Sequence, residues 1–209
     1  GARITSWDDP AIKADNPDAT LPATKITVVQ RSDGSGTTNN FTKYLTAAAP
    51  DTWTLGSGDT VNWPAATQGA EKNSGVAALI GQTDGSIGYV DLADAIKAEL
   101  AFAAIKNAEG NFVAPSASAT AAAVANADVA ENLTYNPLNA PGAESYPITA
   151  PTYLLVTRTQ ADAAKAATLT TYLRYLLTTG QAQAQKLGYV GLPSDLQQKA
   201  YDQVEEIGG

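Results

Sequence analysis

The stretch RSDGSGT, which begins at Arg31, contains the side chains of this chain that are best suited to hold a small anion. Arg31 has a planar, permanently charged guanidinium that can donate to two oxygens of one anion. Ser35 and Thr37 have hydroxyl donors, and Gly36 leaves its backbone N–H open to a close approach. Asp33 would repel an anion that it faced, so we predict that its carboxylate pairs with Arg31. The stretch therefore indicates a site for a phosphate, sulfate or carboxylate.

The sequence around this stretch predicts a strand before it and a helix after it. The run at 25–30 is rich in β-branched residues and predicts a buried strand. Apolar residues at helical spacing then extend from Asn39 to Ala48, so the helix begins near the end of the stretch. The first N–H groups of a helix lack acceptors within the helix, and the helix dipole places partial positive charge there. An anion at that end is therefore stabilised.

The same residues also fit an ordinary helix cap after a glycine turn, with Arg31 in solvent. The pattern is not a Walker phosphate loop, because no lysine follows the second glycine, and it is not a GxGxxG dinucleotide-binding run. The spacing alone leaves the anion site and the plain cap both open.

The remainder of the chain alternates short apolar runs with helical patterns, while residues 1–24 are turn-rich and residues 51–70 irregular. Strands are predicted at 87–90, 100–105 and 153–157, and helices at 73–80, 91–98, 117–130, 169–177 and 192–207. Such alternation predicts an α/β protein with mainly parallel strand pairing. In proteins of this class, ligands bind at the carboxyl ends of strands.

The composition excludes several classes of function. The chain contains no histidine and no cysteine, which removes the commonest general base, the thiolate nucleophile and the usual zinc ligands. We therefore expect no catalytic residue, no metal and no other cofactor, and a phosphoester hydrolase would have little to activate a nucleophile. The net charge of −8 opposes binding to nucleic acid. No apolar run approaches the roughly 20 residues of a membrane span.

Six blocks of the chain, taken in order, resemble the periplasmic phosphate-binding proteins that supply the phosphate ABC transporter. The blocks are ITSWDDPAIKADNP, LPATKITVVQRSDGSGTTNNFTKYL, GVAALIGQTDGSIGYVDLADA, NFVAPS, SYPITAPTYLLV and LGYVGLP. The resemblance implies a two-lobed, periplasmic binding protein-like fold of type II and no enzymatic activity. It also implies inorganic phosphate as the ligand, an ABC-transporter permease as a partner, and a location in the periplasm or outside the cell.

The resemblance assigns roles to the residues of the RSDGSGT stretch. Arg31 would clamp phosphate through its guanidinium. Ser35 would donate its hydroxyl and backbone N–H, Gly36 its N–H, and Thr37 its N–H and hydroxyl. Asp33 would hold Arg31 by a salt bridge without touching phosphate. Phosphate would be bound between two lobes, with no covalent step.

The resemblance also implies a division of the chain. Residues 1–147 would form the complete second lobe with the anion-binding loop, and residues 148–209 a return segment of the first lobe, which is only partly present. The family's N-terminal segment matches nothing here, so we expect weak phosphate binding in which sulfate competes. We also expect apolar surface around 153–157 that a separate N-terminal chain or a second copy would cover. The stretch 69–74 has fewer glycines than in the family, which leaves its conformation open.

The chain contains no methionine, so we expect that a signal peptide or a longer N-terminal part has been removed. The alternative function is that of a truncated or proteolytic fragment, a surface or interaction module without transport competence. Tyr89 and Asp91 follow the GSIG turn. They either line a cleft or have structural roles, Tyr89 in core packing and Asp91 in a helix cap, and we favour the structural roles.

Overall fold

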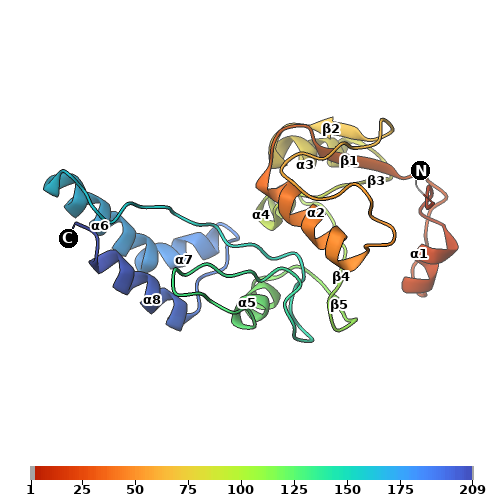
Figure 1. Ribbon diagram of the computed structural model, residues 1–209. Helices are drawn as coiled ribbons and strands as arrows, with labels where there is room; N and C mark the ends of the chain where they lie inside the picture. Colours follow the sequence, from red (N-terminus) through yellow and green to blue (C-terminus); the bar gives the residue numbers. More distant parts are fainter. Residues whose placement is uncertain (1–2, 209) are drawn as a thin grey trace. The chain divides into compact units, whose positions relative to one another are not determined.

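A computed structural model describes residues 3–208 (Figure 1). The chain divides into two compact units: unit 1, Gly1–Ala101, and unit 2, Phe102–Gly209. The lobe boundary expected at residue 147 stays a prediction. Among residues 3–208, no helix is long and apolar enough to cross a membrane.

A small parallel sheet forms the centre of unit 1. Strand β1 (Thr27–Arg31) lies between β2 (Gln68–Ala70) and β3 (Ser86–Ile87), and it pairs in parallel with both. Val29 in the middle strand is fully buried, as expected for a strand with a neighbour on each side. The predicted α/β class and parallel pairing are confirmed here.

The described residues of unit 1 also form four helices: α1 (Pro10–Asp15), α2 (Gly36–Ala48), α3 (Lys72–Gln82) and α4 (Leu92–Lys97). Helix α3 packs on β1 and β2 and also contacts α4. Its residues Val76 and Ala77 are buried, as its apolar spacing requires. The predicted helices at 39–48, 73–80 and 91–98 are therefore confirmed, with starts one to three residues earlier for the first two.

The contact between β1 and the segment after β3 is too close for a side chain at Gly88. A Cβ there would lie 2.7 Å from the backbone oxygen of Val29 and 2.8 Å from a methyl carbon of Ile80. The close approach places Tyr89, the next residue, beside the end of β1, where its hydroxyl makes the hydrogen bonds described below. This glycine thus positions a residue of the site.

Unit 2 consists mainly of helices, namely α5 (Ala117–Ala125), α6 (Ala163–Leu177), α7 (Thr179–Lys186) and α8 (Ser194–Glu205), with a hairpin of β4 (Ile105–Lys106) and β5 (Phe112–Val113). Helix α6 packs against α8 through buried Leu173, Leu196 and Val204. Arg174 and Glu205 join the same two helices by two hydrogen bonds of 2.8 and 2.5 Å. The helices predicted at 169–177 and 192–207 are confirmed.

Two predicted strands are wrong. Residues 153–157 belong to no strand or helix, and Leu155 is 96% exposed. Of the run 100–105, only Ile105 lies in a strand, and that strand is one side of the short antiparallel hairpin. Both runs have strand-like composition, but a strand forms only where another strand accepts its backbone hydrogen bonds. The helix predicted at 117–130 ends at Ala125, while β2, α1 and α7 were not predicted.

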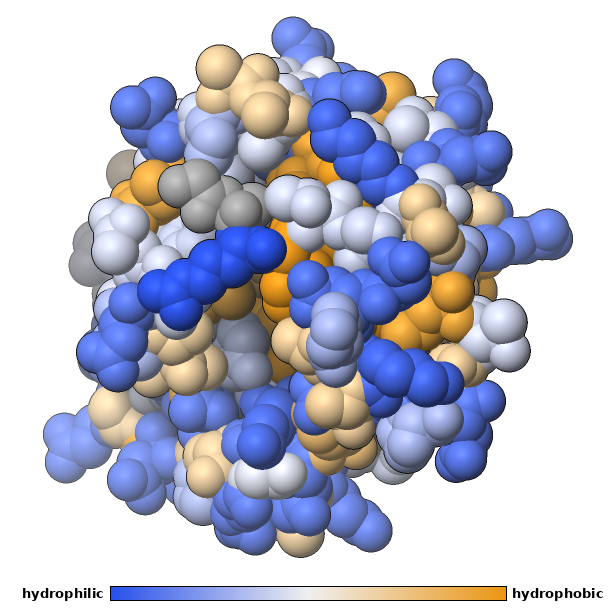
Figure 2. All heavy atoms as spheres, turned by 90° about the vertical axis from the view of Figure 1, so that its right-hand side faces the viewer, coloured by the Kyte–Doolittle hydropathy of each residue, from blue (hydrophilic) through white to orange (hydrophobic). Residues whose placement is uncertain are grey.

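Figure 2 shows one face of the molecule coloured by hydropathy, on which blue, hydrophilic side chains lie among smaller orange, hydrophobic patches.

Candidate anion-binding site

Arg31, at the carboxyl end of β1, is held by Asp33. The guanidinium Nε donates to Oδ1 of Asp33 over 2.7 Å, and Nη2 donates to Oδ2 over 2.7 Å. The Arg31 side chain is only 9% exposed. The hydrogen bonds from Arg31 hold the pKa of the Asp33 carboxyl well below its usual range, and the bond to Asp33 raises the pKa of Arg31. The predicted pairing of these two side chains is confirmed.

The first turn of α2 begins at a capped end. Ser35 is the N-cap residue, and its Oγ accepts from the backbone N–H of Thr37 (3.1 Å) and of Thr38 (3.3 Å). These bonds use the lone pairs of Oγ, so its hydroxyl proton is left for another acceptor. Gly36 is exposed, and a Cβ added there would meet no atom within 4 Å. Space for a ligand therefore exists beside the first amide of the helix.

The backbone N–H of Ser35, expected to donate to phosphate, donates instead to the backbone oxygen of Asp59 over 2.9 Å. Thr37 also differs from its expected role, because both of its donors have acceptors in this structure. Its N–H donates to Ser35 Oγ, and its hydroxyl donates to Oδ1 of Asp91 over 3.2 Å. An anion would have to replace these acceptors in order to use the Thr37 donors. The structure thus contains both the ordinary helix cap, made by Ser35, and the pair of Arg31 with Asp33.

Asn73, in the first turn of α3, connects Arg31 to the start of α2. Its Oδ1 accepts from Arg31 Nη1 over 2.9 Å, and its Nδ2 donates to Oδ2 of Asp91 over 2.6 Å. Nδ2 also lies 3.5 Å from Thr37 Oγ1. Sequence reasoning missed Asn73, because its hydrogen-bond partners, Arg31 and Asp91, belong to other elements of the chain.

Asp91 occupies the N-cap position of α4, but its side chain makes no capping hydrogen bond. The expectation of a cap is therefore wrong for the side chain, which accepts from Thr37 and Asn73 instead. One signal in the sequence could have placed Asp91 at the site. It lies two residues after Tyr89 of the IGYVD run, just beyond a predicted strand.

Tyr89 is buried beneath the site and also forms part of it. Its hydroxyl accepts from the backbone N–H of Arg31 (3.1 Å) and lies 2.7 Å from Thr38 Oγ1. Its ring stacks on Phe41 with centroids 4.6 Å apart and lies near Trp63 at 5.9 Å. The expected core packing of Tyr89 is confirmed, and its hydroxyl additionally ties the end of β1 to the first turn of α2.

The arrangement has the chemistry of a binding site. It offers a guanidinium, hydroxyls and helix amides, which donate hydrogen bonds to negative oxygens. Among residues 3–208, no group of three or more His, Cys, Asp or Glu side chains could hold a metal ion. The two carboxylates, on Asp33 and Asp91, each have donors from within the chain.

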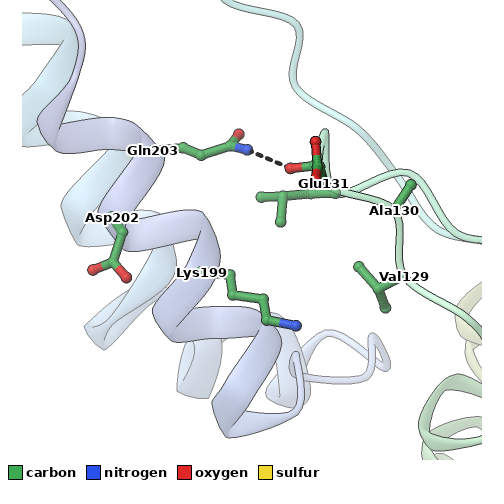
Figure 3. A pocket seen from close by; sticks show the side chains of 7 residues that line it. Val129, Ala130, Glu131, Lys199, Asp202 and Gln203 are labelled. Carbon is green, nitrogen blue, oxygen red and sulfur yellow. Dashed lines mark hydrogen bonds between the residues drawn. The ribbon is translucent and has the colours of Figure 1, made fainter.

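A separate hollow of about 360 Å³ lies in unit 2, between α8 and the loop that contains Val129. Figure 3 shows the side chain of Gln203 reaching that loop, where its Nε2 donates to the backbone oxygen of Glu131 over 3.1 Å. The lining includes the carboxylates of Glu131 and Asp202 and one ammonium, that of Lys199. This excess of negative charge disfavours an anion in the hollow.

Comparisons with known proteins agree with the geometry of unit 1. The family model described as a PBP superfamily domain matches residues 2–179. The chain is 42% identical over 198 residues to the phosphate-binding protein PstS of Xylella fastidiosa (93% of this chain, 54% of that protein). It is 38% identical over 201 residues to PstS of Pasteurella multocida (94% and 58%). The chain thus spans about half the length of the curated relatives it matches.

Solved structures show the same fold. A high-affinity periplasmic phosphate-binding protein bound with phosphate superposes with a TM-score of 0.67 at 22% identity, over 99% of this chain and 67% of that one. A human phosphate-binding apolipoprotein superposes with a TM-score of 0.60 at 18% identity, over 84% and 58%.

Proposed function

We propose that this chain, which belongs to the PBP superfamily, binds inorganic phosphate at the start of α2. Its role would be solute capture for an ABC transporter outside the cytoplasm, with no chemical conversion of the ligand. The observation that carries the proposal is the guanidinium of Arg31, fixed by Asp33 and joined through Asn73 to the first turn of α2. The relatives' printed names, as phosphate-binding proteins, support the choice of phosphate.

The donors that remain at the site fit a tetrahedral oxyanion. A guanidinium has five N–H groups, and Arg31 uses three of them on Asp33 and Asn73, so one on Nη1 and one on Nη2 are left. The hydroxyl proton of Ser35 and the N–H of Gly36 add two donors at the positive end of the α2 dipole. These four donors are the contacts that we assign to phosphate.

We expect the binding by this chain to be weak. Charged oxygens in a protein need donors on all sides, because an unsatisfied buried charge costs free energy. The four donors come from two neighbouring elements, β1 and α2, so the far oxygens of the ligand would remain in water. The Thr37 donors are engaged by Ser35 and Asp91 and become available only if those bonds break. Sulfate, which has the same shape, should therefore compete.

The proposal extends to partners. Tyr153, Leu154 and Leu155 are 44%, 63% and 96% exposed, an apolar run that water covers unfavourably. A separate N-terminal chain or a second copy would bury it. We also propose an ABC-transporter permease as a partner and a location in the periplasm or outside the cell, as the family resemblance implies; the periplasmic location of one structural neighbour supports the latter.

A glycine-to-alanine change tests the assigned position of phosphate. Because a methyl group at residue 36 meets no atom within 4 Å, Gly36→Ala should leave the free energy of unfolding within about 0.5 kcal/mol of the wild type. The methyl would occupy the space given to phosphate, so equilibrium dialysis with labelled phosphate should show about tenfold weaker binding. The matched control is Gly75→Ala, within α3, because Gly75 does not have a positive φ. Gly56 does have a positive φ, so alanine there would be strained. Equal binding by Gly36→Ala and wild type would move phosphate elsewhere.

A further inference from the structure

The amide of Asn73 is the only side chain outside the RSDGSGT stretch, in the described part of the chain, that hydrogen-bonds to the Arg31 guanidinium. Asp33 holds one edge of that guanidinium through Nε and Nη2. The third bond, from Nη1 to Asn73 Oδ1 at 2.9 Å, comes from another element, the first turn of α3. The bidentate contact with Asp33 already restricts rotation about the Nε–Cζ bond, and the bond to Asn73 adds a restraint on rotation about the Cζ–Nη1 bond and joins the guanidinium to α3.

The orientation of the Asn73 amide is itself fixed. Its Nδ2 donates over 2.6 Å to Asp91, whose carboxylate can only accept. A reversed amide would place Nδ2 against the Arg31 donor and Oδ1 against the Asp91 carboxylate, and both contacts would be repulsive. Asp91 therefore determines that Asn73 presents an oxygen to Arg31. Its other oxygen accepts from the Thr37 hydroxyl, which brings the first turn of α2 into the same chain of bonds.

The backbone at Asn73 is held in place as well. Lys72, the residue before it, has a positive φ of 60°, which a non-glycine residue adopts at a cost in free energy. In this conformation its backbone N–H donates over 3.2 Å to Asp33 Oδ1. The start of α3 thus contacts both Asp33 and Arg31, and strained backbone of this kind concentrates at functional sites.

We propose that Asn73 is a positioning residue: with Asp91 fixing its amide, it aligns the Arg31 guanidinium with the first turn of α2 for anion binding. This inference rests on the proposed function. Asn73 does not contact the anion in this account; its effect on affinity acts through the orientation of Arg31 and Thr37. Removing it would leave Arg31 charged and paired with Asp33, but without the restraint on the Cζ–Nη1 bond and without the contact that joins the guanidinium to α3.

The test combines two measurements on the whole chain. NMR of the arginine side chain gives the rate of rotation about the Cζ–Nη1 bond of Arg31, with no ligand present. Titration with inorganic phosphate gives the dissociation constant. Asn73→Ala should speed the rotation at least tenfold and weaken phosphate binding about tenfold, the loss expected for one charge-assisted hydrogen bond. Gln198→Ala is the matched control, because the amide of Gln198 also donates to an aspartate, Asp202, but within α8 of unit 2.

An exchange of the two side chains separates positioning from simple packing. Asn73→Asp alone places two carboxylates against each other and should weaken binding more than Asn73→Ala. The double variant Asn73→Asp, Asp91→Asn keeps the net charge and can rebuild every bond: a carboxylate accepts from Arg31, and the new amide donates to it and accepts from Thr37. It should restore binding to within about threefold of wild type.

The inference is overturned if Asn73→Ala leaves the rotation rate unchanged, or if the exchanged double variant binds phosphate no better than Asn73→Asp alone. A failure of the proposed function would give a different result in these measurements. The wild type would then show no saturable phosphate binding, while the Arg31 rotation would still respond to Asn73→Ala.

Discussion

Two runs that the sequence predicts as strands, the one that forms β1 in unit 1 and residues 153–157 in unit 2, have opposite surroundings. Strand β1 has a parallel neighbour on each side, and its Val29 is fully buried. The run YLLVT pairs with no strand among residues 3–208, and its Leu155 is 96% exposed. Within this run, the Tyr153 hydroxyl exchanges hydrogen bonds with the backbone of Tyr135, and Thr157 accepts two from the side chain of Gln160.

The difference shows how polar side chains come together at the end of a strand. At the end of β1, the neighbours β2 and β3 lead directly into α3 and into Tyr89, and these supply Asn73, Tyr89 and Asp91 around Arg31. Residues 153–157 have no such neighbours, so nothing gathers polar groups at their end. The site is thus a product of the sheet, and changes that affect the two runs should have very different effects.

The largest effect is expected from Arg31→Ala. Arg31 provides two of the four donors assigned to phosphate and the only formal positive charge among them, so its loss should weaken phosphate binding by more than about a hundredfold. Arg174→Ala in unit 2 is the control, because Arg174 makes a similar pair of bonds to Glu205. Equilibrium dialysis measures both. If the two variants bound phosphate equally, the site would not lie at the end of β1.

Core truncations compare the two runs directly. Val29→Ala removes buried methyl groups between two strands and should lower the free energy of unfolding by about 2 kcal/mol. Leu155→Ala removes an exposed side chain and should change it by less than about 0.5 kcal/mol. Urea denaturation followed by circular dichroism measures both. A large loss in Leu155→Ala would mean that residues 153–157 are covered in solution by another chain or copy.

Asp33→Asn tests the support of Arg31 and should weaken phosphate binding about tenfold, although it removes a negative charge near the anion. The bonds from Arg31 hold the pKa of Asp33 below its usual range, so its contribution to stability is present above about pH 4 and is lost as the pH falls further. The stability difference between wild type and Asp33→Asn should therefore be constant between neutral and mildly acidic pH and shrink in strong acid. Tighter phosphate binding by the variant would show that Asp33 faces the ligand.

The smallest effect is expected from Lys72→Gly. Lys72 has a φ of 60°, which glycine adopts without strain, so this change should stabilise unit 1 by about 0.5–1 kcal/mol. Lys43→Gly, in the middle of α2, should instead destabilise by about 1 kcal/mol. Thermal unfolding compares the two variants. The same sign for both would mean that Lys72 does not adopt a positive φ in solution.

The sequence predicted those parts of the molecule that depend on local pattern. The strand before Arg31, helices α2, α3 and α4, and the pairing of Arg31 with Asp33 all follow from residues close together in the chain. It failed where a long-range partner decides the outcome. Residues 153–157 have a strand's composition but no strand beside them, and the three residues of β2 were hidden in an irregular stretch.

The candidate site was predicted in part. The RSDGSGT stretch led to the proposal of Arg31, Ser35, Gly36 and Thr37 as phosphate ligands, and the expected pairing of Arg31 with Asp33 is confirmed. The contacts of Asn73 and Asp91 arise because α3 and the end of β3 meet at the same edge of the sheet. No spacing within the sequence encodes that meeting, so the bond from the Thr37 hydroxyl to Asp91 was missed as well, whereas the bond from the Thr37 N–H to Ser35 belongs to the local helix cap that the spacing allowed.

The most direct test of the proposed function is a phosphate titration followed through the backbone amide signals of the whole chain. We predict saturable shifts that are largest for Gly36 and its neighbours in the first turn of α2 and for the Arg31 side chain. Sulfate should produce similar shifts, and Arg31→Ala should abolish them. If tens of millimolar phosphate moved none of these signals, or moved them equally in Arg31→Ala, the assignment of a phosphate site to this end of β1 would be contradicted.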